Sequence, residues 1–150
     1  MRVNEIMTAN PAFCTPDTSL RVVARLMVAY DCGEIPVVDG RVGMRLVGVL
    51  TDRDITCRAL AQGRNPLELT AADVMTEPCV AIPLDTDLTA CRLTLETLQV
   101  RRLPVVDEAG KCCGIVSQAD IAQFLSDGEA AEVLKKLSQP TTRASAIDLP

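Results

Sequence analysis

The sequence contains no histidine and no tryptophan among its 150 residues, and its only aromatic side chains are Phe13, Tyr30 and Phe124. The absence of histidine argues against a Ser-His-Asp triad, imidazole acid–base catalysis and a histidine-ligated metal. So few aromatic side chains exclude a platform on which several nucleic-acid bases stack. We therefore expect no metal site and none of these chemistries.

Long apolar runs and positive charge are also scarce. No apolar stretch approaches the roughly 18 residues of a membrane span, and the N-terminus, with an early Glu5, does not resemble a signal peptide. Fifteen Lys and Arg against 20 Asp and Glu give a formal net charge of −5, which argues against broad binding to nucleic acid or to an anionic membrane. We therefore expect a cytoplasmic protein with neither of these partners.

Seven cysteines are present, an odd number without a C-x-x-C spacing. This pattern is typical of reduced thiols in a cytosolic protein rather than of a disulfide framework. On a strand, the adjacent Cys112 and Cys113 would point to opposite faces, which disfavours joint metal binding. A thiol-based redox sensor stays open as an alternative function, because cysteine reactivity depends on local surroundings.

Aliphatic residues are abundant, and they recur in an internal repeat. Three segments recur 68 positions later and a fourth recurs 66 positions later. In the first copy these segments begin at Ile6, Asp17, Ile35 and Gly48, and in the second at Val74, Asp85, Leu103 and Gly114. The chain is therefore predicted to consist of one repeat over 1–66, a second over 67–127, and a C-terminal helix and tail over 128–150.

Each copy is expected to fold as a β-α-β-β-α unit, which gives a mixed α and β fold. The expected strands are 13–15, 35–38 and 46–50 in the first copy and 79–82, 103–106 and 111–116 in the second. One helix follows the first strand of each copy, and a second begins at Thr51 (running to about Ala61) or at Ser117. Because one unit alone would leave a helix face uncovered, the copies should pack around a pseudo-twofold axis. A short amphipathic helix is expected over 129–138, with fraying after Pro140.

The motif Gly-x-x-Thr/Ser-x-x-Asp opens the second helix of each copy, with Thr51 and Asp54 in the first and Ser117 and Asp120 in the second. One interpretation is a capping box, in which the hydroxyl and the carboxylate each accept a hydrogen bond from the backbone. The other is a nucleotide site, in which the helix start attracts phosphate, the carboxylate binds ribose hydroxyls and the glycine lets the backbone approach closely. The two interpretations can coexist.

With these motifs, both copies resemble cystathionine β-synthase (CBS) domains, and the resemblance covers roughly residues 3–126. It implies a tandem pair, often paired again into a homodimer, that binds adenosine compounds (AMP, ADP, ATP or S-adenosylmethionine) in clefts between the repeats. It implies no obligatory cofactor. Because the chain also has no activated nucleophile and no P-loop, we expect a non-catalytic module that senses energy or metabolite state. It should signal through its own dimer or act on a separate regulated protein.

Carried over residue by residue, the resemblance implies that Asp54 and Asp120 hold ribose hydroxyls and that Thr51 and Ser117 contact ribose or phosphate. The implied adenine-lining residues are Cys14, Thr15, Ile35 and Pro36 for one cleft and Val80, Ala81, Leu103 and Pro104 for the other. A ligand-free interaction module, in which the motifs serve only as capping boxes, stays open as an alternative.

The two clefts should differ in charge. Gly33 and Glu34 stand where the second copy has Arg101 and Arg102, and Arg53 is a third candidate for binding phosphate. Guanidinium groups suit phosphate oxygens, whereas Glu34 would repel them. We therefore expect the cleft that receives Arg101 or Arg102 to bind a phosphorylated ligand more tightly, unless these residues are solvated surface charges.

Overall fold

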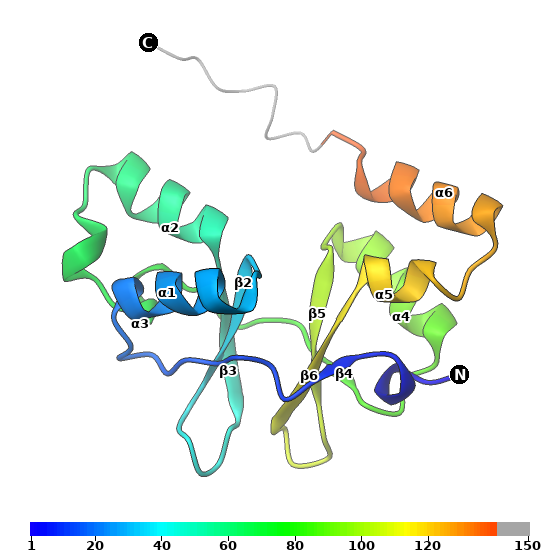
Figure 1. Cartoon of the computed structure of the whole chain (residues 1–150), viewed down its shortest axis with the longest axis horizontal. Helices are drawn as coiled ribbons and strands as arrows, with labels where there is room; N and C mark the ends of the chain where they lie inside the picture. Colours follow the sequence, from blue (N-terminus) through cyan, green and yellow to red (C-terminus); the bar gives the residue numbers. More distant parts are fainter. Residues whose placement is uncertain (141–150) are drawn as a thin grey trace.

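Two repeats stand side by side in the computed structural model, which describes residues 1–140 (Figure 1). Each repeat has a hairpin of two longer strands with its own helices beside it, as the repeated α and β pattern predicts. The predicted fraying after Pro140 lies outside the described residues. No helix within residues 1–140 is long and apolar enough to cross a membrane.

The first repeat is built on the antiparallel hairpin of β2 and β3. Its elements are α1 (Leu20–Tyr30), β2 (Glu34–Val38), β3 (Leu46–Thr51), α2 (Asp52–Arg58), α3 (Ala71–Val74) and the 3-10 turns η2 (Leu60–Gln62) and η3 (Pro66–Glu68). The apolar stripe of α1 is buried as predicted, with Leu20, Val23 and Met27 in the core. The predicted second helix is shorter than expected, because the chain tightens into η2 and turns at Gly63 with φ 72°.

The expected strand at 13–15 is reduced to a single bridge between Cys14 and Val37. Cys14 N donates to the carbonyl of Pro36 at 3.0 Å, and its own carbonyl accepts from Val38 N at 2.9 Å. Pro11 and Pro16 flank this bridge, and proline has no N–H with which to extend a ladder.

The second repeat carries a four-stranded sheet in the order β1-β6-β5-β4. Its elements are β1 (Thr8–Ala9), β4 (Ile82–Pro83), α4 (Leu88–Leu98), β5 (Arg102–Val106), β6 (Cys112–Ser117), α5 (Gln118–Ala122) and α6 (Asp127–Leu137). The chain begins with a 3-10 turn, η1 (Val3–Glu5). The sequence predicts the strands β5 and β6 to within one residue.

The C-terminal helix α6 covers α4 and α5 of the second repeat (Figure 1). It begins two residues before the predicted start, because Ser126 and Glu129 form a capping box around its first turn. Arg92 Nη2 of α4 lies 3.2 Å from Glu132 Oε2 of α6. Val133 of α6 is buried. The helix therefore docks through both apolar and charged contacts.

The segment that starts each repeat packs on the other repeat. β1 pairs antiparallel with β6, with Thr8 opposite Ile115, and Val3 belongs to the core of the second repeat. Likewise, the segment 67–76, which starts the second repeat in the sequence, packs on the first. Thr76 bridges Val49 of β3, and α3 contributes to the core of the first repeat. The two cores are therefore interlocked, whereas the boundaries 1–66 and 67–127 follow the sequence repeat and stay a prediction.

The glycines that begin the two Gly-x-x-Thr/Ser-x-x-Asp motifs, Gly48 and Gly114, lie against the segments that start the opposite repeat. A Cβ atom on Gly48 would lie 2.9 Å from the carbonyl oxygen of Thr76, and one on Gly114 would collide with the side chain of Met7. The close backbone approach expected of these glycines is therefore made to the segment from the opposite repeat.

The two hairpins also meet at their turns. Leu46 N donates to the carbonyl of Gly110 at 3.1 Å, and Cys112 N donates to the carbonyl of Met44 at 2.9 Å. These bonds link equivalent turns of the two repeats and thus hold the hairpins together at one end.

Candidate functional site

The capping-box interpretation is confirmed at both motifs. Thr51 N donates to Asp54 Oδ2 at 3.0 Å, and Asp54 N donates to Thr51 Oγ1 at 3.1 Å. Ser117 N donates to Asp120 Oδ2 at 2.7 Å, and Asp120 N donates to Ser117 Oγ at 3.2 Å. One carboxylate oxygen of each aspartate is therefore used to hold the start of α2 or α5.

The other carboxylate oxygen, Oδ1, has different interactions in the two aspartates. Asp54 Oδ1 lies 3.8 Å from Nε of Arg58, whose Nη1 also donates to two backbone carbonyls at the end of α3. The position equivalent to Arg58 in the second repeat, 66 residues later, is Phe124. Within residues 1–140, Asp120 Oδ1 takes part in no hydrogen bond or ion pair with a side chain. Asp120 therefore keeps one carboxylate oxygen available to a ligand.

Ser117 and Asp120 border a cavity of about 440 Å³ that both repeats enclose. Its walls are the connecting segment 8–12, then Tyr30, Asp31, Cys32 and Glu34 of the first repeat, and Arg102, Ile115, Ser117 and Asp120 of the second. This volume lies within the range of small-molecule sites, about 300–1,000 Å³. The cavity can therefore hold a nucleoside-sized ligand with the free oxygen of Asp120 at its wall.

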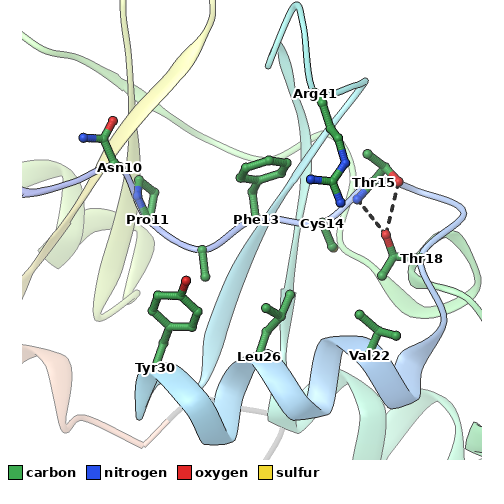
Figure 2. A pocket seen from close by; sticks show the side chains of 11 residues that line it. Asn10, Pro11, Phe13, Cys14, Thr15, Thr18, Val22, Leu26, Tyr30 and Arg41 are labelled. Atoms are coloured by element: carbon green, nitrogen blue, oxygen red, sulfur yellow. Dashed lines mark hydrogen bonds between the residues drawn. The ribbon is translucent and has the colours of Figure 1, made fainter.

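A second hollow of about 370 Å³ adjoins the first and shares residues 10–12 and Tyr30 with it. Figure 2 shows Val22, Leu26 and Tyr30 pointing from α1 toward the segment that contains Phe13. The guanidinium carbon of Arg41 lies 5.9 Å from the centroid of the Phe13 ring. Two of the three aromatic side chains of the protein thus lie on this hollow.

The structure separates several residues that the sequence analysis groups together. Cys14 and Thr15 line the hollow of Figure 2 rather than the cavity at Asp120. Four predicted adenine-lining residues are buried in β2 and β5, namely Ile35, Pro36, Leu103 and Pro104. Val80 is exposed and Ala81 half-buried in the stretch before β4. None of these eight residues borders the cavity at Asp120, so their contact with adenine stays a prediction.

Sequence reasoning missed the wall formed by residues 8–12 and by the end of α1. A signal was present in the recurring segment that begins at Ile6, but its position against the opposite repeat depends on tertiary packing. Thr51, Asp54 and the exposed Arg53 and Arg101 also lie outside the lining of this cavity.

Arg102 and Glu34 line the same cavity, although the sequence analysis expects them in different clefts. The two residues occupy equivalent positions: Arg102 pairs with Ser117 across β5 and β6, and Glu34 pairs with Thr51 across β2 and β3. Because the starts of β2 and β5 both reach the boundary between the repeats, one cavity receives both charges.

Burial raises the pKa of Glu34 from 4.5 to about 7. The nearby charge of Arg102 lowers this pKa and that of Asp54 raises it, both by less than burial does. Glu34 Oε2 is buried and has no hydrogen-bond partner within the described residues. The charge of Glu34 therefore changes near neutral pH.

This pKa predicts how stability depends on pH. Between pH 4.5 and about 7 the folded protein binds more protons at Glu34 than the unfolded chain does, so its free energy of unfolding falls as the pH rises. Relative to Glu34→Gln, we expect the wild-type protein to lose on the order of 2 kcal/mol between pH 5 and pH 8. Urea unfolding of both proteins at each pH measures the difference, and parallel pH profiles would contradict the prediction.

The adjacent thiols have no environment that activates them. Burial raises the pKa of Cys112 to about 11 and also raises the pKa of Cys113. Because their pKa values are raised, these thiols stay protonated at neutral pH. The thiolate is the reactive form of cysteine, so both thiols are unreactive there. The described residues also contain no group of three or more metal-ligating side chains. The redox-sensor alternative gains no support from this pair.

Comparison with known proteins agrees with the repeats and the fold. The family model described as CBS domain matches residues 3–59 and 71–127. The CBS domain-containing protein YhcV of Bacillus subtilis is 34% identical over 137 residues, covering 91% of this chain and 94% of its own. Hypoxic response protein 1 of Mycobacterium tuberculosis is 31% identical over 141 residues, covering 94% and 96%.

Solved structures give the same result. Hypoxic Response Protein I, solved with two coordinated zinc ions, superimposes with a TM-score of 0.75 at 32% identity and covers 84% of this chain and all of its own. CBSX2, from Arabidopsis thaliana, was solved in complex with AMP; it has a TM-score of 0.69 at 27% identity and covers 89% and 98%.

Proposed function

The chain belongs to the CBS domain family, and from this premise we propose that it is a non-catalytic regulatory module that binds an adenosine-containing ligand in the cavity at Asp120. The free Oδ1 of Asp120, on a cavity that both repeats enclose, is the observation that carries the proposal. The AMP complex of CBSX2, a relative at 27% identity, supports the ligand class.

In this proposal Asp120 Oδ1 accepts hydrogen bonds from the ribose hydroxyls, and Ser117 lies beside the ribose. Arg102, next to Ser117 on the neighbouring strand, is the cationic group of the cavity. Because the walls come from both repeats, a bound ligand stabilises one arrangement of the two repeats, and this change is what a separate regulated protein would recognise.

We also propose that the module forms a homodimer through the helices of the first repeat. In the second repeat, α6 covers the part of α4 that carries Arg92 and Glu96, where Arg92 Nε lies 2.8 Å from Glu96 Oε1. At the positions 68 residues earlier, α1 carries Ala24 and Val28, and Val28 is 83% exposed. A second copy would bury this apolar side chain. Sedimentation equilibrium tests the proposal, and a monomer at tens of micromolar, roughly the range of weak interfaces, would contradict it.

Thermal unfolding in the presence of AMP, ADP, ATP, S-adenosylmethionine and 5′-methylthioadenosine tests ligand binding. A ligand present at 100 times its Kd adds about 2.7 kcal/mol to the free energy of unfolding, which raises the Tm of a chain of this size by several degrees. Adenine without ribose is the control and should produce little shift. If no adenosine compound raises the Tm, the ligand-free interaction module becomes the better hypothesis.

A further inference from the structure

The proposed ligand cavity has an excess of negative charge. Among the described residues 1–140, its walls carry three carboxyl groups, those of Asp31, Glu34 and Asp120, but only one guanidinium group, that of Arg102. A phosphate group is itself an anion, so its binding would add negative charge to a wall that the single arginine does not neutralise.

Glu34 is the carboxyl group that the protein compensates least. Asp120 Oδ2 accepts from the backbone N–H of Ser117, whereas Glu34 Oε2 is buried without a hydrogen-bond partner in the described part of the chain. Asp31 is exposed at the end of α1, where water screens it. Arg102 is also exposed, and among the ion pairs of residues 1–140 none joins Arg102 to Glu34 at 4.0 Å or less.

The other groups that face Glu34 offset its charge only in part. The charge of Asp54, at the start of α2, disfavours the ionised form of Glu34. The charge of Glu34 in turn raises the pKa of the Cys79 thiol, which lies before β4. Among residues 1–140, Arg102 of β5 is the cation whose charge favours the ionised form. The environment of Glu34 therefore favours a ligand that brings a positive charge or no charge close to it.

We propose that Glu34 makes this cavity selective for adenosyl ligands whose 5′ substituent carries no phosphate, such as a thioether or a sulfonium, over AMP, ADP and ATP. This inference rests on the proposed function. In this proposal the ribose lies at Asp120 and the 5′ substituent extends toward Glu34, which lines the same cavity of about 440 Å³. Charges closer than the Debye length of about 8–10 Å interact strongly, and more so where water is excluded. A thioether adds no repulsion, and a sulfonium is attracted.

Isothermal titration calorimetry at pH 8 with 5′-methylthioadenosine and AMP tests the inference on the wild-type protein and on Glu34→Gln. The wild type should bind 5′-methylthioadenosine at least about tenfold more tightly than AMP. Glu34→Gln should bind AMP about tenfold more tightly than the wild type does, with its affinity for the thioether nearly unchanged. Asp31→Asn is the matched control, because this exposed carboxyl on the same cavity should change the ratio much less.

A titration at pH 6 adds an arm that uses the wild-type protein itself. Because the pKa of Glu34 is about 7, protonation should narrow the preference of the wild type for the thioether. The AMP phosphate also takes up a proton near pH 6, and Glu34→Gln measures that contribution separately.

Equal affinities for AMP and 5′-methylthioadenosine in the wild type, unaltered in Glu34→Gln, would overturn the selectivity and leave the proposed function standing. Failure of both ligands and of S-adenosylmethionine to bind would overturn the proposed function itself, and the selectivity with it.

Discussion

Replacement of Asp120 by alanine is expected to weaken binding of an adenosine ligand by more than about 100-fold, because two ribose hydroxyls lose a charged acceptor worth about 1.5–3 kcal/mol per hydrogen bond. The free Oδ1 of Asp120 supplies this acceptor on the cavity wall. Calorimetry with 5′-methylthioadenosine and with AMP measures the loss.

Asp54→Ala is the matched control. Both variants lose a capping box of the same kind, which costs about 0.5–2 kcal/mol of stability in either repeat. The ligand effect should differ, because Asp54 Oδ1 is engaged by Arg58 and Asp54 does not border the cavity. Equal losses of affinity in the two variants would contradict the assignment of the ligand to the cavity at Asp120.

Val3→Asp is expected to lower the free energy of unfolding by about 3–5 kcal/mol, because it places an unpaired carboxylate in an apolar core. The side chain of Val3 is fully buried among residues of the second repeat. The backbone N–H of Val3 donates to the carbonyl of Thr86 at 2.8 Å. Urea unfolding of the variant and the wild type measures the loss.

The location of this damage is the sharper part of the prediction. Hydrogen exchange should show loss of protection in β5 and β6 before β2 and β3, although Val3 stands at the start of the first repeat. Val42→Asp, at a position that is 97% exposed in the turn between β2 and β3, should leave stability unchanged within about 0.5 kcal/mol. Loss of protection confined to the first repeat would contradict the interlocked cores.

Features that depend on a few neighbouring residues could be predicted from the sequence. The buried face of α1 follows from the spacing of Leu20, Val23 and Met27, and the capping boxes follow from a hydroxyl and an acid three residues apart. The internal repeat predicted two similar units, because similar local patterns form similar elements.

Features that depend on the opposite repeat could not be predicted in this way. The segment that begins at Ile6 recurs, but the repeat does not reveal that Thr8 pairs with Ile115, so the cavity wall at 8–12 was missed. For the same reason Glu34 was assigned to a different cleft from Arg102, although both reach one cavity. Ser117, Asp120 and Arg102, which one repeat supplies, line the cavity, and their contact with a ligand stays a prediction. The wall that the other repeat supplies was missed.

The distance along the chain between Val3 and the strands that bury it also has a consequence for biosynthesis. Val3 is synthesised about 100 residues before β5 and β6. At about 5–20 residues per second, Val3 waits on the order of 5–20 s before these strands emerge. During this interval the side chain of Val3 lacks the strands that bury it, so the core of the second repeat can close only after β6 has been synthesised.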